Sequence, residues 1–270
     1  MTQPTRRQFL ITCAAGISVA PALWAQTSIP KFTFATISDC HLDDAASAAI
    51  LEKTVRCINE DERISFAVIL GDVATAAETE ELELAKKALD QFTKAWYIVP
   101  GNHDVRPKGD DPIGSYGTIY GAPRWVHAYQ GWALIGFNSC DGSKSDVTVG
   151  TEELDWLRKQ AAALQPDQPV ALFCHHPLNP HSARYRIENA DEIINIFEGH
   201  TLRIAAAGHW HGNQVETQGD ILFTTTACCS TTRNNFDNTA AKGYRLFHIN
   251  GDKVDTEFVE VPVDDKESES

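Results

Sequence analysis

The residues in this sequence best suited to chemistry are aspartates, an asparagine and histidines that recur in five short motifs. In chain order the motifs are Asp39-x-His41, Gly71-Asp72, Gly101-Asn102-His103-Asp104, His175-His176 and Gly208-His209-x-His211. Oxygen and imidazole ligands without a required thiolate suit ions such as Zn, Mn or Fe. The set is too large for one tetrahedral ion and about right for two ions that share a bridging carboxylate. We therefore expect a cofactor of two metal ions (Fe, Mn or Zn).

The charge of the chain restricts what such a centre would act on. The formal net charge is −14, and a strongly acidic protein is not expected to bind a nucleic acid polymer. Two neighbouring metal ions would supply a local positive centre, clamp a phosphoryl group and lower the pKa of bound water. The expected partner is therefore a small phosphoester substrate.

Taken singly, the motifs have ordinary explanations. Gly71-Asp72 alone could be a turn, and His175 alone could be a satisfied core histidine. The pair His209 and His211 is a stronger signal, because alternate residues of an extended segment point the same way. The prediction of a metal centre depends on all five motifs occurring together.

Apolar runs precede the motifs and predict the strands that position them. These runs comprise residues 32–37, 66–70, 96–99, 132–137, 170–174 and 202–207. Helical spacing of apolar residues occurs before residue 59 and over 78–92, 151–164 and 191–198. Strands alternating with helices predict an α/β fold, in which sites form at the carboxyl ends of the strands.

Two regions depart from this alternation. Residues 221–226, 243–249 and 254–261 read as strands without intervening helices, which indicates an antiparallel portion that closes a mixed sheet or a second sheet. Residues 106–122 are rich in Gly, Pro and Asp and predict a long loop over the site.

The two ends of the chain differ from the rest. Arg6-Arg7 precedes an apolar stretch over 11–24 that is too short for a membrane span, so residues 1–25 read as a cleaved export signal. The paired arginines resemble a twin-arginine signal, although an ordinary secretory signal is the alternative. We expect a periplasmic or secreted protein, a single domain over 31–263 and a disordered charged tail over 264–270. The oligomeric state stays open.

The cysteines give a weaker signal. Six of the seven follow the expected export signal, and none forms a C-x-x-C motif, which argues against a thioredoxin-type site or a zinc knuckle. We expect buried small hydrophobic residues and leave open one or two unassigned disulfides. A thiol redox protein built on Cys228-Cys229 is a minor alternative.

The order D-x-H, G-D, G-N-H-D, H-H-P and G-H-x-H resembles the calcineurin-like metallophosphoesterases, from Asp39 to His211. The resemblance implies a four-layer αββα sandwich, in which two mixed β-sheets pack face to face with helices on the outside. It also implies a binuclear metal centre at the strand ends, where a metal-bound hydroxide attacks a phosphodiester or a monoester.

The resemblance also assigns roles to the residues. It implies one metal held by Asp39, His41 and His211, a second metal held by Asn102, His175 and His209, and Asp72 as the bridge. His103 would be the catalytic residue, stabilising charge or protonating the leaving oxygen, rather than a ligand. Asp104 would have a supporting role, and His176 would be part of the turn to Pro177.

The subgroup and the substrate are less sharply defined. Gly71-Asp72 is followed by neither the Asp nor the Arg of the protein Ser/Thr phosphatases, and the chain looks more like the bacterial cyclic-nucleotide and glycerophosphodiester phosphodiesterases. Candidate substrate contacts are His181, Arg184, Arg186, Arg233, Asn234, Tyr116 and Tyr120, of which the tyrosines could stack on a base or cover the site. The alternative function is a non-catalytic metal- and phosphate-binding module on the same fold.

Overall fold

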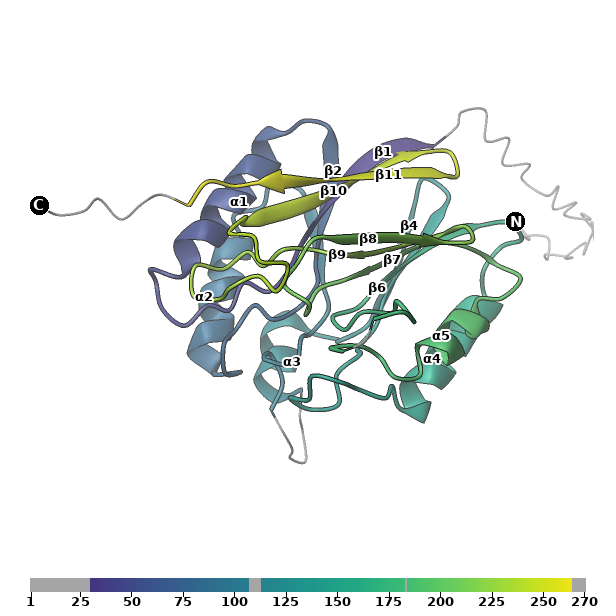
Figure 1. Cartoon of the computed structure of the whole chain (residues 1–270), viewed down its shortest axis with the longest axis horizontal. Coiled ribbons are helices and arrows are strands. Elements are labelled where there is room, and N and C mark those ends of the chain that lie inside the picture. The colour runs from purple at the N-terminus through teal and green to yellow at the C-terminus, as the bar shows by residue number, and fades with distance from the viewer. Residues whose placement is uncertain (1–29, 107–112, 183, 264–270) are drawn as a thin grey trace, which may run out of the picture.

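The chain folds into two β-sheets with helices on their outer faces (Figure 1). The computed structural model describes residues 30–106, 113–182 and 184–263. The predicted export signal over 1–25 and the predicted tail over 264–270 lie outside these residues. Within the described part of the chain, no helix is both long enough and apolar enough to cross a membrane.

The first sheet has five strands. The interior strands β1 and β2 and the edge strand β3 run parallel. Its order is β11 (Lys253–Glu260), β10 (Gly243–Asn250), β1 (Lys31–Ile37), β2 (Ile64–Ile69) and β3 (Ala95–Ile98). Strand β10 pairs antiparallel with both β1 and β11. The helices packed on the outer face are α1 (Ala48–Glu60), α2 (Thr79–Leu89) and α3 (Gly114–Tyr120).

The second sheet has six strands, with a parallel centre and antiparallel edges. Its order is β4 (Trp125–Tyr129), β5 (Trp132–Gly136), β6 (Pro169–Phe173), β7 (Thr201–Ala207), β9 (Ile221–Thr225) and β8 (Gln214–Gln218). Strands β5, β6, β7 and β9 are parallel, while β4 and β8 are antiparallel to their neighbours. Two helices, α4 (Thr151–Ala162) and α5 (Ala190–Ile196), pack on its outer face.

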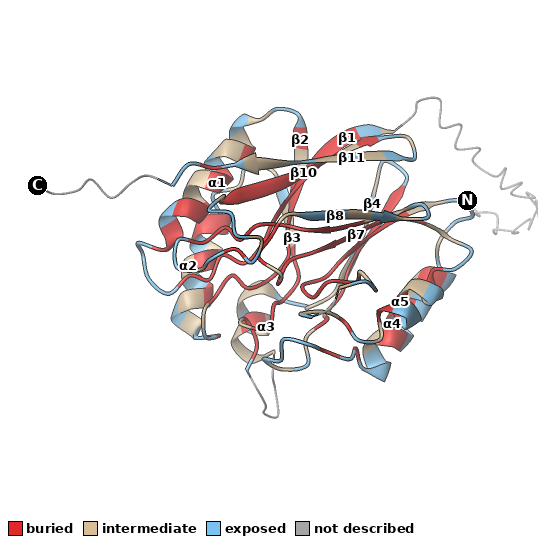
Figure 2. Ribbon diagram, in the orientation of Figure 1, coloured by how far each residue is buried: buried red, intermediate tan, exposed pale blue. Residues whose placement is uncertain are grey.

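Alternation along the strands separates the layers. In β1, Phe32 and Phe34 point between the sheets, whereas Ala35 and Ile37 face the helices. The ring of Phe34 stacks on Phe66 at 5.1 Å and meets Phe173 of the second sheet at 5.7 Å. Figure 2 shows the buried residues running through both sheets and the inner helix faces. The predicted α/β fold, a four-layer sandwich of two mixed sheets, is confirmed.

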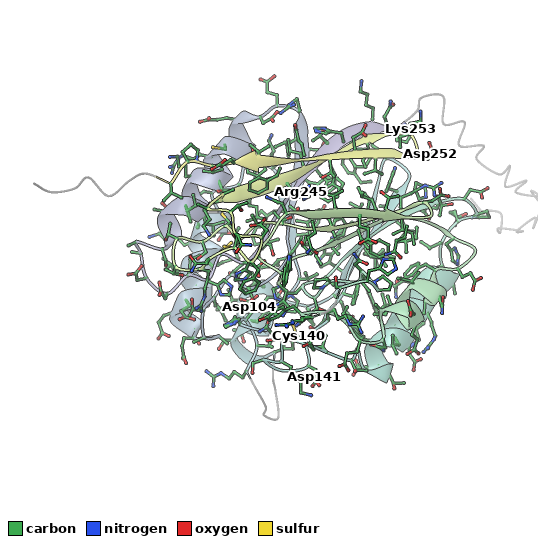
Figure 3. The ribbon with its side chains drawn as sticks, in the orientation of Figure 1. Asp104, Cys140, Asp141, Arg245, Asp252 and Lys253 are labelled. Atoms are coloured by element: carbon green, nitrogen blue, oxygen red, sulfur yellow. The ribbon has the colours of Figure 1, made fainter. Side chains whose placement is uncertain are left out.

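A buried arginine joins the sheets near the site. Arg245 of β10 (Figure 3) is 2% exposed, and its guanidinium donates to Asn213 Oδ1 at 2.9 Å, in the turn before β8. Asn213 Oδ1 also accepts a hydrogen bond from the Ala227 amide, after β9. Strand β10 of the first sheet is therefore hydrogen-bonded to the turn before β8 of the second sheet, and that turn is held to the loop after β9.

Two expectations need correction, and both concern residues 106–122. The predicted loop over 106–122 contains α3, and Tyr116 of that helix is fully buried. Tyr120 donates its hydroxyl to Leu82 O at 2.8 Å, so neither tyrosine covers the site. The edge strands β4 and β8 were not predicted. The six cysteines of the described residues are all free thiols, so no disulfide joins two of them.

Candidate metal centre

Four of the predicted ligands form a first buried cluster. The ligand atoms of Asp39, His41, Asp72 and His211 lie within 4.8 Å of one another. His41 Nε2 and His211 Nε2 face each other at 3.1 Å, and His211 Nε2 lies 3.3 Å from Asp39 Oδ1. The loops after β1, β2 and β7 supply these side chains, because those parallel strands end at the same edge of the sandwich.

The remaining predicted ligands form a second cluster beside the first. The ligand atoms of Asp72, His175 and His209 also lie within 4.8 Å of one another. His175 Nε2 is 3.0 Å from His209 Nδ1 and 3.0 Å from Asn102 Oδ1. All seven predicted metal ligands are thus brought together, and all are buried.

Asp72 belongs to both clusters through a single oxygen. Its Oδ2 lies 3.6 Å from His41 Nε2 and 3.2 Å from His175 Nε2. Its Oδ1 faces the other way and accepts a hydrogen bond from the His103 amide at 2.7 Å. Asp72 therefore faces both clusters with the same oxygen, Oδ2. A carboxylate can also bridge two ions by offering one oxygen to each, but Oδ1 of Asp72 is turned toward the His103 amide.

Main-chain carbonyls fix which ring nitrogen of three histidines carries the proton. His175 Nδ1 donates to Leu70 O at 2.7 Å, His209 Nε2 to Ser145 O at 2.9 Å, and His211 Nδ1 to Asn234 O at 3.2 Å. A carbonyl can only accept, so the opposite nitrogen of each ring faces its cluster. Such outer partners orient metal-binding imidazoles and raise their basicity.

The carboxylates of the two clusters, Asp39 and Asp72, remain ionised. Burial alone raises the pKa of Asp39, but the charge and hydrogen bond of His211 outweigh it and bring the pKa to about 2. Burial likewise opposes ionisation of Asp72, whose pKa is nevertheless held well below its usual value, chiefly by His175. Buried negative charges of this kind need a positive partner.

The other histidines offer neutral nitrogens to the same space. Burial lowers the pKa of His41 to about 3 and that of His209 to about 4, so both rings are neutral at neutral pH. Neutral imidazoles and ionised carboxylates are the donor set that Zn, Mn and Fe accept. Against burial, which lowers it, Asp39 raises the pKa of His211 to about 11, and Asp72 likewise raises that of His175 to about 9. Without a metal, each facing pair of ring nitrogens, 3.0–3.1 Å apart, can therefore share a proton in the place that a metal cation would take. The residues present therefore fit metal ions.

The backbone is strained where the ligands leave the strands. Five ligands have left-handed φ values, which are uncommon for residues other than glycine: Asp39 (57°), His41 (46°), Asp72 (52°), His209 (64°) and His211 (40°). Strain of this kind persists only where surrounding structure enforces it, and it clusters at functional sites. At this site the left-handed backbone turns the motif residues away from the direction of the preceding strands.

Two glycines are required for close approach rather than for flexibility. A Cβ on Gly101 would lie 2.1 Å from Asp72 Oδ1. A Cβ on Gly208 would lie 1.7 Å from Ser38 Oγ and 2.8 Å from Asp39 Oδ2. Ser38 is buried and donates to Asp39 Oδ2 at 2.5 Å, so it cannot move aside without releasing that carboxylate.

A Gly208→Ala variant tests this close approach. We expect metal affinity to fall by about 10–100-fold, the range for disturbing the outer partners of a metal ligand. The measurement is metal titration of the purified variant. Gly150→Ala is the matched control, because no atom lies within 4 Å of its new Cβ and its φ of −74° suits alanine. Equal metal affinity in the two variants would contradict the steric argument.

His103 and Asp104 lie beside the clusters without joining them. His103 Nδ1 donates to Thr75 O at 2.6 Å, and its half-buried ring borders the cavity over the clusters. Asp104, labelled in Figure 3, is buried, and its carboxylate accepts from the Ala74 and Gly101 amides at 2.9 and 2.8 Å. Burial and the charge of Asp72 raise the pKa of Asp104 to about 7. Asp104 therefore ties the loop after β2 to the loop after β3.

His176 has a supporting position as well. Its ring is buried, where Nδ1 lies 2.9 Å from Ser139 Oγ and Nε2 lies 3.1 Å from Lys144 O. Both partners belong to the loop after β5. The next residue of that loop, Ser145, supplies the carbonyl that orients His209.

The predicted substrate contacts separate into two groups. Arg233 and Asn234 border a cavity of about 380 Å³ over the two clusters, together with Tyr185 and Phe236, which the sequence reasoning missed. His181 and Arg184 instead line a neighbouring cavity of about 590 Å³. The guanidinium of Arg186 donates to Pro180 O at 2.9 Å.

Comparison with known proteins places this geometry in a family. The model of the calcineurin-like phosphoesterases matches residues 32–213. A relative from Psychrobacter arcticus, named "probable cyclic nucleotide phosphodiesterase", is 23% identical over 86% of this chain and 88% of its own. A relative from Arcobacter nitrofigilis, named "probable glycerophosphodiester phosphodiesterase", is 26% identical over 71% of this chain and 76% of its own.

Similarity to solved structures concerns the fold. A purple acid phosphatase from yellow lupin (Lupinus luteus) superposes with a TM-score of 0.64 at 12% identity. The match covers 86% of this chain and about half (52%) of the lupin chain. The family match spans more than half of the present chain, including all five motifs. The chain therefore belongs to the calcineurin-like phosphoesterases and is a phosphoric ester hydrolase.

Proposed function

We propose that the chain hydrolyses phosphodiesters with two metal ions. The observation that carries the proposal is the position of Asp72 Oδ2, which faces His41 of one cluster and His175 of the other. One group holds Asp39, His41 and His211, and the other holds Asn102, His175 and His209, which is the division that the family resemblance implies. The names of the two curated relatives, both phosphodiesterases, support a diester as the substrate.

Each part of the cavity has a task in this reaction. When bound, the two ions would neutralise phosphoryl oxygens and lower the pKa of water, so that hydroxide is available as the nucleophile at neutral pH. His103 Nδ1–H donates to Thr75 O, so the doubly protonated ring would carry on Nε2 the proton that it gives to the departing oxygen. Arg233 contributes positive charge to the rim of the cavity, where the acidic chain would otherwise repel the phosphate.

Removing the metal tests the proposal. We expect chelation of the purified protein to abolish hydrolysis of bis(p-nitrophenyl) phosphate, and Mn, Fe or Zn to restore it. The expected rate for this diester exceeds that for p-nitrophenyl phosphate, and metal analysis should find both sites filled in the active protein.

A different outcome would favour the other function considered for this fold. If the metal-loaded protein bound phosphate but hydrolysed neither ester, it would be a non-catalytic metal- and phosphate-binding module. Faster hydrolysis of the monoester would contradict the diester preference while retaining the metal centre.

A further inference from the structure

We infer that Tyr185 and Phe236 form a stacking site for the base of a nucleoside, so that the substrates are nucleoside phosphodiesters rather than esters of small alcohols such as glycerol. The inference rests on the proposed function. It assigns a specificity role to two residues that belong to neither metal cluster and to none of the five motifs.

The first observation is a set of aromatic rings built onto the metal ligands. The ring of Phe236 stacks on the His211 imidazole, with centroids 5.1 Å apart and an interplanar angle of 6°. Tyr185 stacks on Phe236 at 5.3 Å and meets the edge of His209 at 5.4 Å. Trp210 lies between His209 and His211 in the sequence. Its ring centroid is 5.8 Å from that of Tyr185 and 5.4 Å from that of Phe236. An apolar wall therefore begins directly beside the reacting centre.

The second observation is that Phe236 remains exposed in a loop that is firmly held. Its exposed fraction is 43%, although its amide donates to His211 O at 2.9 Å. The neighbouring Asn235 side chain donates to Ala241 O at 2.7 Å, and Asp237 accepts from the Asn213 amide at 2.8 Å. The exposure of Phe236 is thus a fixed feature of the surface rather than the result of a loosely attached loop.

The chemistry of this wall selects the ligand. Aromatic faces stack on any base, because every base has a π-face, whereas a glycerol group offers only hydroxyls and short alkyl carbons. Arg233 and Asn234 border the same cavity and provide the polar contacts that a phosphate and a base edge require. A nucleoside joined to the phosphate would place its base against Phe236 and Tyr185.

The test uses two diesters that share one leaving group. Thymidine 5′-(p-nitrophenyl phosphate) and ethyl p-nitrophenyl phosphate both release p-nitrophenolate, so they differ only in the group that stays on phosphorus. The quantity measured on the metal-loaded full chain is the selectivity, the kcat/KM for the nucleoside ester divided by that for the ethyl ester. We expect the unmodified protein to prefer the nucleoside ester.

Variants at position 236 then assign the preference. We expect Phe236→Ala to lower the selectivity by about tenfold, which is the order expected for loss of one base–aromatic stack, and Phe236→Tyr to retain it. The control is Val126→Ala on β4, which shortens an exposed apolar side chain that does not border the cavity. It should not change the selectivity.

Two outcomes would overturn the inference. Equal rates for the two esters in the unmodified protein would remove the nucleoside preference while leaving the phosphodiesterase proposal intact. A Phe236→Ala variant that lost both activities in proportion would show that the ring only positions His211. Hydrolysis of neither ester by the metal-loaded protein would instead contradict the proposed function itself.

Discussion

Asp72→Asn is expected to remove both metal ions and to lower kcat/KM for a phosphodiester by at least about 10³-fold. Asparagine has nearly the same shape and keeps an oxygen for the His103 amide, but it replaces the Oδ2 that faces both clusters with a neutral group. Metal ions supply several kcal/mol of charge stabilisation in such a transition state, and each 1.36 kcal/mol is worth tenfold in rate. Metal analysis and steady-state kinetics of the purified variant measure both effects.

Variants of single-cluster ligands provide the matched comparison. His209→Ala removes a ligand of the second cluster, and His211→Ala removes one of the first, so each is expected to weaken mainly one ion. Asp72→Asn should weaken both. If it bound as much metal as the unmodified protein, the bridging role of Asp72 would be wrong. If it lost only one ion, the two clusters would be independent sites.

The positions of the ligands could be predicted because each follows a recognisable strand. Continuous apolar runs such as residues 66–70 indicate strands buried on both faces, and parallel strands of one sheet end at a common edge. Those two rules are enough to bring the loop of Asp72 next to that of Asn102. The four-layer arrangement itself came from the family resemblance, since apolar periodicity does not say which sheet a strand joins.

The missed elements have patterns that are weak for physical reasons. Strands β4 and β8 lie at the edges of the second sheet, and their residues are half-buried or exposed, so neither shows a continuous apolar run. Helix α3 has only seven residues and begins at Gly114, within a stretch whose glycine and proline content indicates a loop. Tyr116 therefore looked available to a ligand although it is fully buried.

The finer geometry of the site could not be predicted from the sequence either. The carbonyls of Leu70, Ser145 and Asn234 orient three ligands, and every residue carries such a group. The left-handed backbone at the ligands is imposed by surrounding loops rather than by residue type. Phe236 was missed because an isolated aromatic residue in a polar segment is ordinary until the fold stacks it on His211.

His103→Ala is expected to separate proton transfer from metal binding. The ring lies in neither cluster, so both ions should be retained. Loss of a positioned general acid costs about 10²–10⁴-fold when the leaving group needs a proton. We expect a loss in this range for a diester that releases phenolate, and a clearly smaller loss for one that releases the less basic p-nitrophenolate. His248→Ala, on β10 and hydrogen-bonded to Glu257, is the control and should change neither rate.

The dependence of the rate loss on the leaving group distinguishes a general acid from a residue that only supports the loop. A ring that only supports the loop through its bond to Thr75 O would, when removed, loosen the segment whose amide at His103 holds the Asp72 carboxylate. The variant would then lose metal and hydrolyse both esters more slowly, by the same factor. Full metal content with unchanged rates would mean that the leaving oxygen departs without help from this residue. Only a variant that keeps its metals and loses activity in proportion to the basicity of the leaving group places His103 Nε2 at the departing oxygen.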